Sequence, residues 1–411
     1  MELPEDVISE IFSRLPAKSI FKFKSCCKSI SNFTNNACFA LKQAQNMMLK
    51  GNSSLVIQGR TFLRRKTAYE LPGNETSSSG IPTKFLQFLD KRKISIVASS
   101  NGLLLCLITR PKLVLVLFIC NPATQSCSTI ATPACLFPTV EFAFVWNHST
   151  EEFQLIYFDQ NPRQGASSRE FVCKVYMPKE GEWKERGSLS LNEDRSKIYG
   201  SHVFYNGNIY FASCFDNSSY TRRYHFMSSY NFETGVTRRV HYPEQVVEIG
   251  YNRPNADWHY WIDIFNWGKA GTSNDDESIC VVSLVHLSAF TIWVLTDLES
   301  SSWSKFLSIS FQEMGLEEDA PVVYDFKIMN GDSLVFISWS TKNVYVYDLL
   351  GAKGKRLEKI GQLEADQYVS IIRLEKIGQL EADQYVSIIP YSSTLRSCGA
   401  GAKRFRYEIE K

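Results

Sequence analysis

Hydrophobic residues in the first fifty positions recur every three to four residues, which is the spacing of an amphipathic helix. Val7, Ile11 and Leu15 form one stripe, and Ile8 lies beside it. Pro16 cannot continue a helix, because proline lacks the amide hydrogen and clashes with the preceding turn. The pattern therefore predicts a first helix that ends before Pro16.

Two further helices are expected before residue 51. Ile20, Phe23 and Ile30 lie on one narrow seam, which predicts a second helix over residues 18–30. A third helix is expected over residues 36–50, where a glycine follows as a helix stop. Because so small a unit is near the lower size limit for independent stability, we expect a partner to cover its apolar faces.

From residue 54 onward the sequence changes to short apolar and aromatic runs separated by Gly, Asn, Asp, Ser and Pro. Such runs are typical of strands joined by turns. No segment after residue 50 keeps a helical stripe for three turns. We therefore expect a helical domain over residues 1–50 and an all-β domain over residues 51–411.

One hairpin pattern recurs in the all-β domain. An Asn-Gly pair precedes an apolar strand at Asn101, Asn206 and Asn330, and this dipeptide favours the tight type I′ turn. The pairs are 105 and 124 residues apart, which is about two units of 50–60 residues each. Four-stranded blades of that length predict a β-propeller of about six blades. Two stacked β-sandwich domains are the alternative.

A 17-residue segment near the end of the chain occurs twice without a change, as Arg356–Ile372 and Arg373–Ile389. Either copy could supply the strand that closes a propeller. The second copy continues directly into Pro390 and Tyr391, so we predict that the second copy lies in the sheet and that the first loops out. Closing a loop that is longer by one copy costs only on the order of 1 kcal/mol.

The charge balance excludes several classes of partner. The chain has 45 Lys and Arg against 43 Asp and Glu, a formal net charge of +2, so nothing predicts binding to nucleic acid or to a membrane surface. The longest apolar run, Leu113–Cys120, has eight residues, far below the ~20 needed to span a bilayer. The first residues are acidic and lack the regions of a signal peptide. We expect a soluble protein of the cytoplasm, the nucleus or both.

The sequence shows no pattern typical of an enzyme. The six His form no His-x-x-x-His pair, and the eleven Cys form no Cys-x-x-Cys pair. No phosphate-binding loop and no Gly-x-Ser-x-Gly nucleophile turn occurs. We therefore expect no catalytic residue, no metal ion and no cofactor.

Aromatic residues in loop-like segments are candidates for contacts with a bound substrate. They are Phe215, Tyr220, Trp258, Tyr260 and Trp261. Aromatic side chains often anchor a protein partner, because they bury a large area at low entropic cost. The alternative is that these residues belong to the core.

Several motifs match one family. Leu3–Ser29 contains two Leu-Pro pairs twelve residues apart, a helical stripe between them and a later Cys-Lys-Ser, and this pattern resembles an F-box. Ser99–Leu104 followed by Asn121–Thr124 resembles the signature of the domain that follows the F-box in the large plant F-box family. Similar to later motifs of the same domain are Leu284–His286 with Thr291–Val294 and Trp303–Lys305, and Pro390–Leu395.

The resemblance implies a short three-helix F-box followed by a kelch-like β-propeller that binds a protein substrate. An F-box docks a Skp-type adaptor, which links it to a cullin–RING ubiquitin ligase, so the chain would be a non-catalytic substrate receptor. The docking surface implied by the resemblance is formed by Leu3, Pro4, Val7, Ile8, Ile11, Leu15, Pro16, Ile20 and Phe23. The alternative is that these side chains only pack the helices together.

Two residues depart from the family pattern. Ile30 stands where the family has Trp, and Ser25 stands where it has Cys. We expect these changes to weaken adaptor docking rather than abolish it. A non-degradative propeller scaffold with a degenerate F-box is therefore the competing hypothesis.

Overall fold

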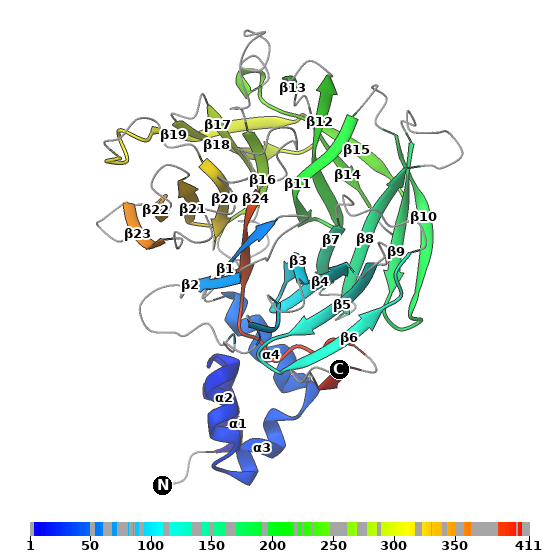
Figure 1. Ribbon diagram of the computed structural model, residues 1–411, viewed down its shortest axis with the longest axis vertical. Helices are drawn as coiled ribbons and strands as arrows, with labels where there is room; N and C mark the ends of the chain where they lie inside the picture. The colour runs from blue at the N-terminus through cyan, green and yellow to red at the C-terminus, as the bar shows by residue number, and fades with distance from the viewer. Residues whose placement is uncertain are drawn as a thin grey trace, which may run out of the picture.

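The chain forms four helices followed by a ring of β-sheets (Figure 1). This computed structural model describes residues 4–49, 54–60, 68–71, 81, 85, 87–89, 94–109, 115–133, 142–147, 152–160, 170–190, 196–217, 221–223, 226–231, 233–246, 261–268, 278–285, 289–316, 323–329, 331–338, 343–350, 357–362, 385–399 and 402–404. The helices lie at one end of the ring (Figure 1).

The helical region comprises α1 (Glu5–Ser13), α2 (Ala17–Lys24), α3 (Lys28–Thr34) and α4 (Ala37–Leu49). The first and last of these agree closely with the helices expected from the hydrophobic spacing. The expected second helix over residues 18–30 is instead split into α2 and α3. The prediction of three helices is therefore wrong by one.

The break between α2 and α3 has a local cause. The Ser25 hydroxyl donates to the Lys22 carbonyl oxygen at 2.7 Å, which satisfies a backbone group at the end of α2. Cys27 then adopts an extended backbone with φ −144° and ψ 125° before α3 begins. The apolar seam continues across this break, so its spacing could not reveal the break.

Strands in the described residues form six sheets, which we number as blades in chain order. Blade 1 consists of β3 (Ile94–Ser100), β4 (Leu103–Thr109), β5 (Leu115–Asn121) and β6 (Ser126–Ile130), with β25 (Lys403–Arg404) at its outer edge. Blade 2 consists of β7 (Phe142–Asn147), β8 (Glu152–Gln160), β9 (Glu170–Met177) and β10 (Glu182–Ser190). Blade 3 consists of β11 (Ser196–Tyr205), β12 (Asn208–Asn217), β13 (Thr221–Arg223), β14 (Phe226–Tyr230) and β15 (Thr237–His241).

The remaining sheets complete the ring. Blade 4 consists of β16 (Trp261–Trp267), β17 (Ser278–Val285), β18 (Ala289–Asp297) and β19 (Ser302–Ser310). Blade 5 consists of β20 (Val323–Met329), β21 (Ser333–Ser338), β22 (Asn343–Asp348) and β23 (Leu357–Gln362). The closing sheet consists of β24 (Tyr385–Tyr391), β1 (Ser54–Arg60) and β2 (Ala68–Leu71).

The closing sheet joins the two ends of the β-region. β1 pairs with β24 in antiparallel register, with Ile57 opposite Ile388, and the two strands lie side by side in Figure 1. Five sheets have the four strands of a complete blade, and the closing sheet has three described strands. The β-propeller predicted from the repeat is therefore confirmed, with five complete blades and a smaller sixth sheet.

Each contact between neighbouring sheets has its own hydrophobic core cluster. In β5, for example, Leu117 and Ile119 face blade 2, whereas Phe118 and Cys120 face the closing sheet. Both faces of such a strand are buried, which explains why these strands are continuous apolar runs rather than alternating ones.

Two of the three Asn-Gly pairs form the turns that their sequence predicts, and Asn330 of the third lies outside the described residues. Asn101 and Gly102 have φ of 50° and 80°, and Asn206 and Gly207 have φ of 47° and 73°. Positive φ at both central residues is the requirement of a type I′ turn. Each pair joins the first two strands of a blade, and the two turns lie two blades apart as the spacing predicted.

The turns between the third and fourth strands of a blade share a second feature, a side-chain hydrogen bond to the backbone of the turn. An Asn or Asp at the end of the third strand accepts a hydrogen bond from the backbone N–H two residues later. These residues are Asn121, Asn231, Asp297 and Asp348. Blades 1, 3, 4 and 5 are thus built from the same local unit.

Tryptophans on the outer strands connect neighbouring blades. The Trp183 indole N–H of blade 2 donates to the Ala131 carbonyl oxygen beside blade 1. The Trp303 indole N–H of blade 4 donates to the His241 carbonyl oxygen of blade 3 at 2.7 Å. The motif around Trp303 therefore has a structural role in the ring.

The two copies of the duplicated segment supply different strands. Leu357–Gln362 of the first copy forms β23, and Tyr385–Ile389 of the second copy forms most of β24. The predicted place of the second copy in the sheet is confirmed. The prediction that the first copy loops out is wrong for Leu357–Gln362, because the backbone of this segment pairs with β22, with Leu357 opposite Tyr347. Residues 363–384 lie outside the described part of the chain.

Candidate functional site

Exposed apolar side chains concentrate on α1 and α2. Of the seven large hydrophobic residues that are exposed in the described part of the chain, four lie on these helices: Val7 (39%), Ile11 (48%), Phe21 (37%) and Phe23 (45%). We call these four residues the helical patch. The other three are spread over the propeller as Val236, Phe306 and Leu350. Apolar groups exposed to water favour covering by a partner. Val7 and Ile11 share one face of α1, whereas Phe21 and Phe23, two positions apart, lie on different faces of α2.

Aromatic packing supports the helical patch from behind. The Phe12 ring lies edge-on to Phe23, with centroids 5.2 Å apart, and edge-on to Phe33 at 5.8 Å. Phe33 in turn contacts Phe39 of α4 at 5.4 Å. Such edge-to-face pairs fix ring orientation, so the Phe23 side chain of the patch is held in place before any partner binds.

Lysines border the helical patch. The Lys24 Nζ lies 5.3 Å from the centroid of the Phe21 ring and donates to the Asn35 side-chain oxygen at 2.8 Å. Partial burial lowers the pKa of Lys24. Lys22 and Lys28 are exposed nearby. These lysines lie on the α2 and α3 side of the patch, whereas Glu5 and Asp6 lie beside Val7 on α1. The α2 side therefore favours acidic groups on a partner.

Three of the predicted docking residues, Val7, Ile11 and Phe23, belong to the helical patch, and Pro4 is also exposed. The sequence interpretation missed Phe21, although its position next to the inward seam residue Ile20 places it on another face of α2. Exposure of this kind is compatible with docking.

The remaining predicted docking residues are less accessible. Ile8, Leu15 and Pro16 are half-buried, and Leu3 lies outside the described residues. Ile20 is fully buried in a cluster with Ala123 and Leu395 of the propeller region. Ile20 therefore faces the chain's own β-domain.

The predicted substrate-binding aromatics are only partly described. Phe215 lies near the end of β12, and Trp261 is the first residue of β16 in the next blade. Both positions lie at the end of the ring away from the Asn206–Gly207 turn. Near that end β13 pairs with Phe215 and lies opposite the helices (Figure 1). Tyr220, Trp258 and Tyr260 lie outside the described residues.

A small pocket lies between blades 3 and 4. It has a volume of about 240 Å³ and is lined on its apolar side by Tyr210, Val236 and Leu298. Burial raises the pKa of Tyr210 to about 12, so its hydroxyl is neutral at physiological pH. The pocket has room for a single side chain of a partner.

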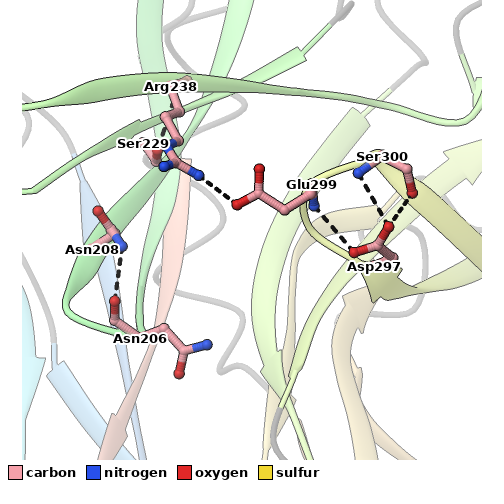
Figure 2. A network of polar contacts seen from close by, with 7 residues as sticks. All are labelled: Asn206, Asn208, Ser229, Arg238, Asp297, Glu299 and Ser300. Carbon is pink, nitrogen blue, oxygen red and sulfur yellow. Dashed lines mark hydrogen bonds and ion pairs between the residues drawn. The ribbon is translucent and has the colours of Figure 1, made fainter.

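An exposed ion pair borders this pocket. Figure 2 shows Arg238 of β15 reaching across to Glu299 of blade 4, with Nη1 and Oε1 2.6 Å apart. The turn that carries Glu299 is ordered by Asp297, whose carboxylate accepts from the backbone N–H groups of Glu299 and Ser300. The Ser300 hydroxyl also donates to the Asp297 carboxylate, and this bond, with the two backbone bonds, holds the pKa of Asp297 below its usual value.

No group of His, Cys, Asp and Glu in the described residues is arranged to hold a metal ion. Several buried thiols lie in the sheets instead, and burial raises the pKa of Cys173 and Cys398 to about 12. Such thiols remain protonated and are poor nucleophiles. No helix within the described ranges is long and apolar enough to cross a bilayer.

Comparison with known families extends this description. A family model described as "F-box associated beta propeller domain" matches residues 63–396, and one described as "F-box domain" matches residues 1–42. An F-box/kelch-repeat protein of Arabidopsis thaliana is 24% identical over 324 residues, covering 74% of this chain and 75% of the relative. An Arabidopsis thaliana F-box protein is 24% identical over 331 residues, covering 75% and 79%.

A probable F-box protein of Arabidopsis thaliana is 32% identical over 106 residues. This match covers 26% of this chain and 26% of the relative, so the chain spans about a quarter of that relative's length. Among solved structures, a chain from a nidogen/laminin complex has a TM-score of 0.44 at 10% identity, covering 83% of this chain and 99% of that one. A fucose-specific lectin from Aleuria aurantia has a TM-score of 0.44 at 10% identity, covering 76% and 92%. These structural scores carry no conclusion about function.

Proposed function

This chain belongs to the plant F-box proteins that carry an F-box associated beta propeller domain, and on that basis we propose that it is the substrate-recognition subunit of a Skp–cullin–F-box ubiquitin ligase. Its helices dock a Skp-type adaptor, and its propeller holds a protein substrate. The chain itself supplies no catalytic group.

The observation that carries this proposal is the helical patch. Its four side chains are 37–48% exposed although each is large and apolar. A stable protein interface buries on the order of 1,200–2,000 Å², and its energy is concentrated in a few such side chains. The lysines of α2 and α3 beside the patch add complementarity to acidic groups on the adaptor surface that covers them.

The proposed mechanism is proximity. A substrate held on the propeller and a ubiquitin-charged enzyme held through the adaptor belong to one assembly, so their encounter becomes effectively intramolecular. The substrate's lysines are then presented at high effective concentration. This role requires two separate binding surfaces on one rigid support, one on the helices and one on the blades.

A Val7→Asp/Ile11→Asp double variant would test the proposed docking surface. Both side chains are exposed, so the substitutions are expected to leave folding intact. Burying the new carboxylates against the adaptor should weaken binding by about 100-fold or more, because each lost contact is worth ~1.5–2 kcal/mol. Affinity for a purified Skp-type adaptor is measured by calorimetry, with thermal unfolding as the check on folding.

The matched control is Phe306→Asp/Leu350→Asp. These two residues are equally exposed, at 40% and 50%, but lie on the propeller. The control should bind the adaptor as tightly as the unmodified chain. Equal affinity of the helical variant and the unmodified chain would contradict the proposed docking surface.

The second candidate is a propeller scaffold that no longer binds an adaptor. Its support is the position of the two departures from the family pattern. Ser25 lies in the break after α2, where its hydroxyl bonds the Lys22 carbonyl oxygen, and Ile30 is half-buried in α3, which begins directly after that break. Failure of the unmodified chain to bind any Skp-type adaptor would favour this scaffold.

A further inference from the structure

The C-terminal segment Tyr391–Cys398 holds the helices against the propeller. The Gln43 side chain of α4 is fully buried. Its amide nitrogen donates to the carbonyl oxygens of Leu15 at 3.0 Å and Ser393 at 3.1 Å, and its oxygen accepts from the Leu395 backbone N–H at 2.9 Å. One side chain therefore joins α4, the loop before α2 and a segment 350 residues later in the chain.

A small apolar cluster surrounds this amide. Ala17 and Ile20 of α2 and Phe39 of α4 pack with Ala123 of blade 1 and with Leu395. All five side chains are at most 8% exposed. We call this cluster, together with Gln43, the junction. Because water is excluded there, breaking any Gln43 hydrogen bond leaves a buried polar group unsatisfied.

The C-terminal segment is in turn fastened to blade 1. The Thr394 hydroxyl donates to the Asn101 carbonyl oxygen at 2.8 Å. The Asn121 amide nitrogen donates to the carbonyl oxygens of Thr394 at 2.9 Å and Arg396 at 2.8 Å. Gly102 admits this close approach, because a Cβ there would lie 2.2 Å from the Thr394 hydroxyl oxygen.

The motifs around Asn101, Asn121 and Leu395, which are far apart in sequence, thus meet at the place where the helices are attached. If the helices were joined to the propeller only by the backbone that follows α4, they could rotate about that single connection. The two Gln43 hydrogen bonds to Ser393 and Leu395, with the Ala17 backbone N–H that donates to the Ser393 carbonyl oxygen at 3.4 Å, add a second attachment that restricts this rotation.

We infer that Gln43 is a positioning residue, which fixes the angle between the adaptor-facing helices and the propeller and thereby selects the substrate lysines that the ligase reaches. This inference rests on the proposed function. Tilting the helices against the propeller would break the two Gln43 hydrogen bonds to Ser393 and Leu395 together, while the bond to Leu15 stays within the helical region.

The test compares Gln43→Leu with Gln45→Leu. Leucine has nearly the volume of glutamine but makes no hydrogen bonds. Gln45 is exposed on the same helix, so it controls for the change of residue type. Gln43→Asn is a milder variant, which keeps the amide but shortens its reach. A fourth variant carries Gly-Ser-Gly-Ser inserted after Gly51, which lengthens the chain connection and leaves Gln43 in place.

The first measurement needs no partner. Amide hydrogen exchange in residues 391–396 should be about tenfold faster or more in Gln43→Leu, because loss of the clamp lowers the free energy of local opening. Gln43→Asn should fall between Gln43→Leu and the unmodified chain. Gln45→Leu should exchange as the unmodified chain does. Unchanged exchange in Gln43→Leu would overturn the assignment of Gln43 as the clamp.

The second measurement uses the ligase assembled from the full chain, a Skp-type adaptor and a cullin–RING module. Ubiquitin sites on the receptor's own lysines are mapped by mass spectrometry. In Gln43→Leu the modified lysines should increase about twofold in number while adaptor affinity stays within about twofold. The Gly51 insertion variant should keep the original sites, because the clamp and not the connection sets the angle.

An unchanged set of sites in Gln43→Leu despite faster exchange would overturn the positioning role. A changed set in the insertion variant alone would assign that role to the chain connection instead. Absence of adaptor binding by the unmodified chain would refute the proposed function separately, because the exchange experiment does not depend on it.

Discussion

Gly102 and Gly207 occupy the same position in two hairpins, yet their surroundings differ. Their φ values are nearly equal, at 80° and 73°. A Cβ on Gly207 would meet its nearest neighbour, the Asn231 side chain, at 3.9 Å, whereas one on Gly102 would overlap Thr394 and Ser392. Turn chemistry alone accounts for Gly207. Gly102 is required in addition by the C-terminal segment that crosses it.

We predict that Gly102→Ala destabilises the protein far more than Gly207→Ala does. Alanine at positive φ costs ~1 kcal/mol at either position. At Gly102 the overlap with backbone and side-chain atoms should add ~2 kcal/mol or more. Urea denaturation of both variants measures the difference, and equal losses would show that the close approach is not tight.

In two places a continuous sequence pattern is divided between two secondary-structure elements. The apolar seam over residues 18–30 runs through the break between α2 and α3. The duplicated segment likewise contributes its first half from one copy, as β23, and its second half from the other, as β24. A single copy contains both strand sequences in the right order, so the second copy adds only length between them.

Deletion of residues 368–384 removes one copy and leaves β23 and β24 intact. The connection between the two strands becomes 17 residues shorter, which should stabilise the fold by on the order of 1 kcal/mol. The melting temperature is expected to stay equal or to rise by a few degrees. Calorimetry measures this change, and a marked fall in melting temperature would mean that both copies are structurally required.

The whole ring is held together at its inner strands by buried polar groups as well as by the apolar clusters. Lys327 of β20 lies 3.0 Å from the Asp263 carboxylate of β16 and 3.8 Å from Asp325. Asp325 also accepts from the Ile388 backbone N–H of the closing sheet at 2.7 Å. Three neighbouring sheets are thus connected through one charged cluster. Burial raises the pKa of Asp325, against the opposing effect of Lys327.

His202 of β11 connects the next sheets. Its Nε2 accepts from the Phe144 backbone N–H of β7 at 3.1 Å. Burial lowers the pKa of His202 to about 4, with a smaller opposing effect of the Phe144 backbone. The cationic Lys327 lowers this pKa further, whereas the Asp263 carboxylate raises it. The folded ring therefore favours neutral His202.

The pH dependence of stability should reflect this histidine. In the unfolded chain His202 binds a proton near pH 6.5, but in the folded chain only near pH 4. Protons therefore favour unfolding in this range, and stability should fall by on the order of 2 kcal/mol as pH drops from 6.5 to 4. Chemical denaturation across this range measures the slope.

The control for this slope is His202→Gln, whose side-chain oxygen can still accept from the Phe144 N–H but does not titrate. Asp325 contributes with the opposite sign, because its raised pKa favours the folded state as pH falls. Since Asp325 is present in both proteins, the difference between their slopes isolates His202. Identical slopes would contradict its low pKa.

The sequence by itself determined the features that depend on near neighbours. Three- and four-residue spacing predicted α1 and α4, and the Asn-Gly pairs predicted the positive φ at Asn101 and Asn206. The repeat distance predicted a propeller, because each blade is a local unit of similar length. The F-box motif in turn predicted the family, which the comparisons confirmed.

Only the tertiary structure decided which apolar face of a helix is buried against the rest of the chain. Ile20 and Phe21 are adjacent apolar residues, but Ile20 is fully buried and Phe21 is 37% exposed. Ile20 is covered by Leu395, which lies more than 350 positions away. Spacing along a helix specifies its faces but not their neighbours, because neighbours come from distant segments whose approach depends on closure of the whole ring.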